Sequence, residues 1–285
     1  MGGCSAVQLV NSVSRIYDVH EITDVPFGQN AQLKLDLYLP DKPPLSQERT
    51  PVVVFFYGGS WNRGDKAEYA FAGRKLASMG FIVGIPNYRL YPEVTYPAFL
   101  EDSAQGVKKV LELTRQEAFK AYRPADQVVV MGHSAGAYNA AMLAMDDRWL
   151  ASAGLNRKTL VQGLIGMAGA YNIYPIRVPE VKPVFHHPNY PEKSQPIDFV
   201  KESNIDTLIL APENDDLVSL ERNSFALAKA LAQNSTPKQL VTVKGTDHIS
   251  LIGTLSPLLF FKGDSAQPIA QFIHSLQKPQ TNSRF

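Results

Sequence analysis

The chain has 285 residues, 45% of them hydrophobic and 19% charged, so it can bury a large core and wholesale disorder is not expected. Its 28 basic and 27 acidic residues leave a formal net charge of +1, which gives no electrostatic reason to expect nucleic acid or a polyanionic surface as a partner. The one cysteine cannot form an internal disulfide. No zinc-type Cys/His spacing and no C-x-x-C motif occurs, which argues against structural metal and dithiol chemistry.

That cysteine, Cys4, lies in the first segment of the chain, "MGGCSAV". Gly3-Cys4-Ser5 resembles the end of a bacterial lipoprotein signal, in which the cysteine is lipidated after cleavage, although no apolar segment comes before it here. Two interpretations stay open: a lipid anchor at Cys4 of a cell-envelope protein, or an ordinary exposed cysteine of a cytoplasmic protein. We expect residues 1–14 to form an N-terminal tail and 15–285 a single domain, with no transmembrane segment.

Apolar runs and helical patterns then alternate along the chain. Residues 15–22 and 32–40 are predicted to be early strands that pair in antiparallel fashion. The second is expected to be half-exposed because its leucines alternate with polar residues. Strands separated by helical segments predict an α/β fold with a mostly parallel sheet covered on both faces. Further strands are predicted over 51–59, 81–88, 126–132, 159–169, 206–212 and 238–245, and helices over 67–80, 96–116, from Ser134 onward, 219–233 and 266–277.

A proline-rich stretch, 171–199, breaks this alternation. A stretch of this length is either a functional lid or a surface excursion. Because it precedes the strand at 206–212, we expect it to wall one side of an open pocket with its aromatic residues, the alternative being that these residues pin the loop to the core. Those aromatics are Tyr171, Tyr174, Phe185, Tyr190 and Phe199.

The sequence "VVVMGHSAGAYNAAMLA" (128–144) places Ser134 between Gly132 and Gly136, at a junction between a predicted strand and a predicted helix. This G-x-S-x-G pattern is typical of a nucleophile elbow, in which the serine hydroxyl is exposed on a tight, strained turn. The motif is short enough to occur by chance, so the rest of the chain has to supply a base, an acid and an oxyanion site.

Chain order favours His248 as the base, since it follows the last predicted strand and the order for this arrangement is Ser, acid, His. His186 and His187 lie in the proline-rich stretch, and His274 lies inside the closing helix.

The acid is expected in "LILAPENDDLVSL", which ends a buried strand with Glu213, Asp215 and Asp216. Acids here would also suit a helix N-terminus near Ser219, so catalytic and capping roles are both open. Asp247, next to the base, is expected to shape its loop.

The oxyanion site is expected in "FFYGGSW", where Gly58 and Gly59 permit a sharp turn after an apolar strand. The amides of Gly59 and Ser60, together with that of Ala135, are the candidate donors. A phosphate-binding glycine turn is the alternative, but neither G-x-G-x-x-G nor a P-loop pattern is present. We therefore expect no cofactor and no metal.

Five motifs in this order resemble the α/β-hydrolase superfamily, and within it the carboxylesterase/lipase branch with a His-Gly-Gly-x-Trp oxyanion motif. The chain is similar also to kynurenine formamidases and to esterases grouped with bacterial feruloyl esterases. The matching motifs are "YGGSWNRGDK" (57–66), "NYRLYPEVTYPAFLED" (87–102), "GHSAGA" (132–137), "PENDDLV" (212–218) and "GTDHISL" (245–251).

The resemblance implies an α/β-hydrolase fold without a full helical cap, Ser134 as nucleophile, His248 as base, and Asp215 in preference to Asp216 as acid. Here Tyr57 replaces the histidine of the oxyanion motif and Pro212 replaces the glycine of the acid motif. Arg89 and Asp102 match positions that serve structure in the family.

The expected function is cofactor-free hydrolysis of short- to medium-chain or aryl carboxylic esters, a small-molecule substrate, through an acyl-enzyme. Amide hydrolysis of an aryl formamide is the enzymatic alternative. A catalytically silent α/β-hydrolase that serves as a binding module is the alternative from another class.

Overall fold

The computed structural model describes residues 3–45, 47–233 and 238–277. Within these ranges one mixed sheet runs through the centre of the molecule, in the order β1-β2-β4-β3-β5-β6-β7-β8. Its strands are β1 (Val19–Pro26), β2 (Lys34–Pro40), β3 (Thr50–Phe56), β4 (Ile82–Pro86), β5 (Pro124–His133), β6 (Val161–Met167), β7 (Asp206–Pro212) and β8 (Lys238–Val243).

The sheet is antiparallel at one edge and parallel elsewhere. β1 pairs with β2 and β2 with β4 in antiparallel fashion, whereas β4, β3, β5, β6, β7 and β8 pair in parallel. This is the mostly parallel α/β sheet with an antiparallel start that the alternation of elements predicted. Because the carboxyl ends of parallel strands lie at one edge, the loops after β3, β5, β7 and β8 meet there.

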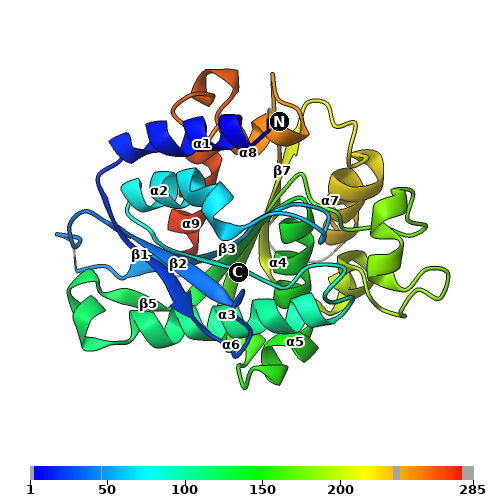
Figure 1. Cartoon of the computed structure of the whole chain (residues 1–285), viewed down its shortest axis with the longest axis horizontal. Helices are drawn as coiled ribbons and strands as arrows, with labels where there is room; N and C mark the ends of the chain where they lie inside the picture. Colours follow the sequence, from blue (N-terminus) through cyan, green and yellow to red (C-terminus); the bar gives the residue numbers. More distant parts are fainter. Residues whose placement is uncertain (1–2, 46, 234–237, 278–285) are drawn as a thin grey trace, which may run out of the picture.

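Helices cover both faces of the sheet (Figure 1). α2 and α9 lie on one side together with α1, and α3 and α4 lie on the other. The α-helices are α1 (Gly3–Val13), α2 (Ala70–Ser78), α3 (Ala98–Thr114), α4 (Ala135–Met145), α5 (Asp147–Ser152), α6 (Arg157–Leu160), α7 (Ala226–Leu231), α8 (His248–Gly253) and α9 (Ala266–Gln277). Short helical turns connect them: η1 (Ser14–Ile16), η2 (Lys66–Tyr69), η3 (Glu117–Tyr122), η4 (Pro179–Val181), η5 (Pro183–Phe185), η6 (Pro196–Glu202), the π-type turn η7 (Glu221–Phe225) and η8 (Phe260–Lys262).

The end of α1 and the residue after it contact α2 and η2. The side chain of Asn11, in α1, donates to the backbone oxygen of Ala67 at 2.8 Å and accepts from the Phe71 amide at 2.9 Å. Arg74 of α2 donates to the Ser14 hydroxyl at 3.0 Å. Cys4 lies in the first turn of α1, and its side chain is outside the described part of the structure. Lipidation at Cys4 stays a prediction.

Strand β2 differs from its predicted half-exposed state, because both of its faces are buried. Asp36 and Tyr38 point away from the leucine face and are only 2% and 1% exposed. The reason is that α2 and η2 cover this face, where Lys66 Nζ reaches the Asp36 carboxylate at 2.7 Å. An ion pair therefore occupies a position where the alternating pattern predicted solvent.

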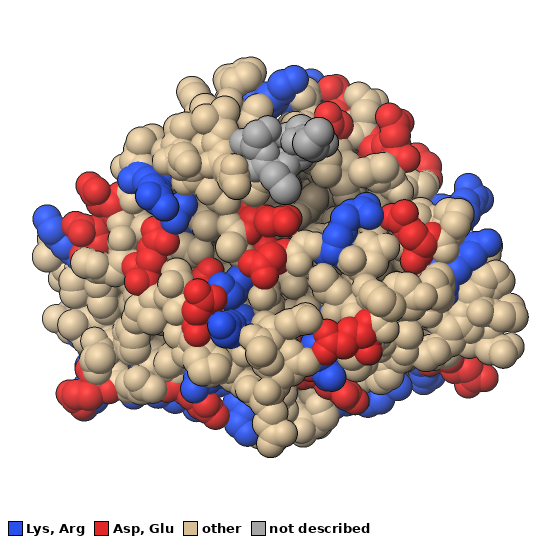
Figure 2. Space-filling view, viewed as in Figure 1, with Lys and Arg blue, Asp and Glu red and all other residues tan. Residues whose placement is uncertain are grey.

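The surface agrees with the balanced charge of the sequence. On the face shown in Figure 2, acidic and basic side chains are interspersed and form no continuous area of one sign. Across the described ranges, none of the helices has both the length and the apolar character needed to cross a bilayer.

Candidate active site

Ser134 lies directly after β5, on a turn that only small neighbours permit. Its backbone has φ 55° and ψ −119°, a strained conformation for a residue with a side chain, and α4 begins at the next residue. A Cβ on Gly132 would lie 2.2 Å from the Gly136 oxygen, and a Cβ on Gly136 would lie 2.1 Å from the Phe56 oxygen. Both glycines of the motif are therefore required by backbone contacts, as a nucleophile elbow demands.

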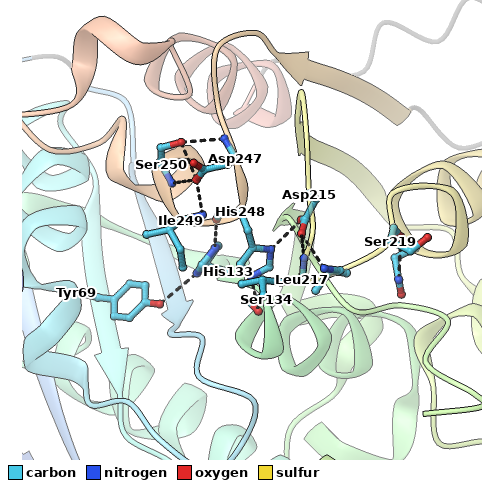
Figure 3. Close-up of polar contacts among 12 residues, drawn as sticks. Tyr69, His133, Ser134, Asp215, Leu217, Ser219, Asp247, His248, Ile249 and Ser250 are labelled. Carbon is cyan, nitrogen blue, oxygen red and sulfur yellow. Dashed lines mark hydrogen bonds and ion pairs between the residues drawn. The ribbon is translucent and has the colours of Figure 1, made fainter. Parts of the chain in front are cut away.

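The structure brings the three predicted triad residues into hydrogen-bond contact. His248 Nε2 lies 2.9 Å from Ser134 Oγ, and His248 Nδ1 lies 2.7 Å from Asp215 Oδ2 (Figure 3). The side chains of His248 and Asp215 are 7% and 0% exposed. A carboxylate can only accept, so it fixes the proton on Nδ1 and leaves Nε2 free to take the serine proton.

Of the two adjacent aspartates, Asp215 is the one that contacts His248. Asp215 uses its second oxygen, Oδ1, to accept from the amides of Leu217 at 2.9 Å and Val218 at 2.7 Å. These bonds hold the carboxylate in the orientation that faces the imidazole. Asp216 is exposed and lines the cavity in front of the triad. The resemblance favoured Asp215 over Asp216, and of the two it is Asp215 whose carboxylate lies within hydrogen-bond distance of His248.

The other acids of these loops have local roles. Asp247 is the N-cap of α8 and accepts from the Ser250 amide at 2.8 Å, so His248 is the first residue of a helix rather than part of the loop expected there. Glu213 accepts from the Gly245 amide at 2.9 Å, which ties the loop after β7 to the loop after β8. Of the alternative bases, His274 packs against the Phe81 ring, away from Ser134.

The three predicted oxyanion amides border the same cavity as Ser134. Gly59 and Ser60 have φ values of 132° and 55°, so the loop after β3 turns sharply here, and Ala135 is the first residue of α4. None of these three amides donates to another group within the described residues. Trp61 anchors the loop, because its indole Nε1 donates to Asn139 Oδ1 at 3.0 Å. The arrangement can therefore offer amides to a developing oxyanion next to the serine.

A cavity of about 780 Å³ opens in front of Ser134, and the proline-rich stretch walls one side of it. The wall is aliphatic, not aromatic as predicted, and comes chiefly from Ile173, Ile176, Val178 and Val181. The predicted aromatics are used elsewhere: Phe185 is fully buried and packs edge-on against the Trp61 ring at 5.0 Å. The expectation that the aromatics line the cavity is therefore wrong, and the alternative holds: they attach the proline-rich stretch to the core, where large rings bury the most apolar area.

The rim of the cavity is polar. The guanidinium of Arg63, on the oxyanion loop, lies 3.0 Å from the carboxylate of Glu180 in the proline-rich stretch. Both residues line the cavity, so this ion pair joins two of its walls. In the described residues no group of three or more His, Cys, Asp or Glu side chains is arranged to hold a metal ion.

Two residues close to the triad were not anticipated from the sequence. His133 lies directly before Ser134 and is buried, and Tyr69 lies beside it at the floor of the cavity (Figure 3). Burial has the larger effect and the neighbouring His248 the smaller one, and together they lower the pKa of His133 from its ordinary value of 6.5 to about 3. A histidine at the first variable position of G-x-S-x-G was the one available signal, and the pattern assigns that position no role.

The sequence matches the model of a known protein family. The model of the BD-FAE family matches residues 35–231. A probable isoprenylcysteine alpha-carbonyl methylesterase of Oryza sativa subsp. japonica is 34% identical over 156 residues, which cover 53% of this chain and 36% of that protein. The chain thus spans about a third of the length of this relative.

Two further comparisons extend over more of the chain. A kynurenine formamidase of Danio rerio is 26% identical over 239 residues, which cover 82% of this chain and 76% of that protein. The crystal structure of esterase B from Lactobacillus rhamnosis superimposes with a TM-score of 0.71 at 19% identity, covering 96% of this chain and 92% of that one. This structural likeness shows that the fold is the one found in α/β-hydrolase esterases.

Proposed function

Because this chain belongs to the BD-FAE family, we propose that it is a serine hydrolase that cleaves carboxylic esters through a covalent acyl-enzyme. Ser134, His248 and Asp215 are its catalytic residues in this proposal. The observation that supports it most strongly is the continuous set of hydrogen bonds from Ser134 Oγ through both nitrogens of His248 to Asp215, at the floor of an open cavity.

The chemistry follows from the direction of those bonds. Ser134 Oγ attacks the ester carbonyl carbon while its proton passes to His248 Nε2, and the carboxylate of Asp215 stabilises the resulting imidazolium. The carbonyl oxygen becomes negative and accepts from the amides of Gly59, Ser60 and Ala135. When the C–O bond breaks, His248 gives its proton to the departing alcohol. Water then attacks the acyl-enzyme by the same route, releases the carboxylic acid and restores Ser134.

The cavity supports short- to medium-chain or aryl esters as substrates. Its aliphatic wall offers apolar contact to an acyl group, while the Arg63–Glu180 pair limits one side of it. Each methylene that fits or fails to fit such a wall changes transition-state binding by about 1–3 kcal/mol. We therefore expect the highest kcat/KM on short acyl chains and little turnover of long-chain triglycerides.

Hydrolysis of an aryl formamide is the second candidate. The match to the kynurenine formamidase extends over 82% of this chain, more than the match to the methylesterase does. The same nucleophile and base would serve, with His248 protonating an amine instead of an alcohol.

The test is turnover of p-nitrophenyl esters of rising acyl length, with an aryl formamide alongside, on the wild type and on Ser134→Ala. A fluorophosphonate probe should add once to the wild type, at Ser134, and not to the alanine variant. Loss of the nucleophile should lower kcat by about six orders of magnitude. Ser219→Ala removes another serine that lines the cavity and should still be labelled.

Each candidate gives a different result. If the wild type cleaves the formamide in preference to the esters, the protein is a formamidase and the esterase proposal is wrong. A wild type that neither turns over nor reacts with the probe would be a binding module, and the proposal would be wrong.

A further inference from the structure

A second set of hydrogen bonds lies behind the triad and is not used by the proposed chemistry. His133 Nε2 lies 2.9 Å from the backbone oxygen of His248, and His133 Nδ1 lies 3.1 Å from the Tyr69 hydroxyl (Figure 3). The amide of Gly58 lies 3.2 Å from the same hydroxyl. These contacts join the segment of the base, the residue before the nucleophile and the oxyanion loop.

The direction of every bond in this set is determined. The His248 carbonyl can only accept, so His133 Nε2 carries a proton. With its pKa lowered to about 3, the His133 ring is neutral and its Nδ1 is an acceptor. The Tyr69 hydroxyl, whose pKa burial raises to about 12, must then donate to Nδ1. Its oxygen is left to accept from the Gly58 amide. No member can reverse without leaving a buried group unpaired, which costs about 1–3 kcal/mol.

Tight packing keeps these groups in place. A Cβ on Gly58 would lie 3.0 Å from His133 Nδ1 and 3.0 Å from the Cβ of Ser134, so the oxyanion loop rests directly on the elbow. The rings of His133 and His248 are 5.0 Å apart between centroids. His133 is 2% exposed, so little solvent can replace its bonds.

The Gly58 amide differs from the next two amides of the oxyanion loop, because it has a hydrogen-bond partner in Tyr69. Gly58 N–H points to the tyrosine hydroxyl, whereas the amides of Gly59 and Ser60 have no partner in the described structure. Tyr69 thereby fixes the orientation of the peptide that precedes the proposed oxyanion donors.

We propose that His133 and Tyr69 are positioning residues for ester hydrolysis. His133 holds the main chain of His248 so that Nε2 faces Ser134, and Tyr69 holds Gly58 so that the next two amides face the acyl oxygen. This inference rests on the proposed function of the same site.

Two substitutions at His133 separate its two bonds. The side-chain nitrogen of glutamine reaches about as far as imidazole Nε2, so His133→Gln keeps a donor for the His248 carbonyl. The shorter His133→Asn places its amide near the position of Nδ1 and cannot reach that carbonyl. We expect kcat of the glutamine variant to stay within about threefold of wild type and kcat of the asparagine variant to fall about tenfold or more, the effect of one lost hydrogen bond at a reacting group.

Tyr69→Phe tests the other end. It leaves the Gly58 amide without an acceptor and should lower kcat about tenfold, with a matching rise in the inhibition constant of an aryl boronic acid, whose tetrahedral adduct needs the oxyanion amides. KM should stay within about twofold, since no bond to the ground-state substrate is removed. The matched control is Tyr138→Phe, which removes a buried tyrosine bond of 2.6 Å to the Ser194 oxygen and should lower Tm without changing kcat.

The outcomes are distinct. Equal kcat values for the glutamine and asparagine variants, or equal kcat values for Tyr69→Phe and Tyr138→Phe, would overturn the inference. So would losses that appear in KM, because His133 and Tyr69 would then bind substrate. If His133→Asn does not fold, the tyrosine pair decides. A wild type without turnover and without labelling at Ser134 would overturn the proposed function, and this inference with it, before any variant is compared.

Discussion

Acidification from pH 7 to pH 5 should remove about 2 kcal/mol of folding free energy through His133 alone. The ring is buried as the neutral form, and its pKa is lowered from 6.5 to about 3. In the unfolded chain the same ring titrates near 6.5. Between these two values the unfolded state therefore binds a proton that the folded state does not.

The sign and size follow from this difference. Because the unfolded state binds more protons, the free energy of unfolding rises with pH across this window. The stability that His133 contributes by staying neutral is fully present above pH 6.5. Below that pH the free energy of unfolding falls by about 1.4 kcal/mol for each pH unit, until the folded ring also takes up a proton near pH 3. From 6.5 down to 5 the loss is one and a half such units, or about 2 kcal/mol. Solvent screens this ring little, since His133 is buried.

The measurement is urea unfolding of the wild type and of His133→Gln at pH 7, 6 and 5. Other titrating groups are common to both proteins, so the difference between their free energies of unfolding isolates His133. We expect that difference to move by about 2 kcal/mol in favour of the glutamine variant as the pH falls from 7 to 5. Parallel curves would refute the reasoning, because they would mean that the buried ring accepts its proton as readily as an exposed one does.

Three further predictions concern the site itself. Asp215→Asn should lower kcat by about four orders of magnitude, because the amide would stabilise the wrong tautomer of His248. The kcat of Asp216→Asn should stay within about twofold of wild type. A larger loss at Asp216 would reverse the assignment. Gly59→Ala should lower kcat about a hundredfold, because its Cβ would lie 2.1 Å from the Arg63 backbone oxygen and displace the loop. The control is Gly80→Ala, at φ 95° with no atom within 4 Å of the added Cβ, which should lower Tm alone. Equal activities of the two variants would show that the loop does not shape the oxyanion site. Ile176→Ala should shift the best acyl chain toward longer esters in a kcat/KM series, and an unchanged profile would place the acyl group elsewhere.

Much of the fold could be predicted because burial leaves a pattern in the sequence. Strands such as β3 and β7 are almost wholly apolar, and the glycines around Ser134 mark the elbow. Short helices such as α5 and α8 were missed, since six residues carry too little periodicity to be recognised. The burial of β2 was missed for a different reason. Asp36 is polar, and its pairing with Lys66 depends on a residue thirty positions away.

Some features of the site could likewise be predicted from the sequence, and others could not. A local motif marks the backbone of the nucleophile, because both glycines of G-x-S-x-G are required by backbone contacts. The contact of Gly132 is with Gly136 inside the motif, whereas that of Gly136 is with Phe56 at the end of β3. The residue types of the loop after β7 did not distinguish the two adjacent aspartates, and only the family resemblance favoured Asp215, the one that contacts His248. The aliphatic wall of the cavity depended on which residues of the proline-rich stretch the core had already taken, as Phe185 illustrates.

The bonds of His133 are the extreme case of this limit. They connect residues 58, 69, 133 and 248, which come from four separate segments, and they involve a backbone amide and a backbone carbonyl as well as side chains. Every residue except proline has both backbone groups, so the amino-acid type at position 58 or 248 does not signal the contact. A triad motif specifies which atoms react, but the groups that aim those atoms are chosen by the fold. For that reason the variants of His133 and Tyr69 test a property of the three-dimensional structure that the five sequence motifs do not contain.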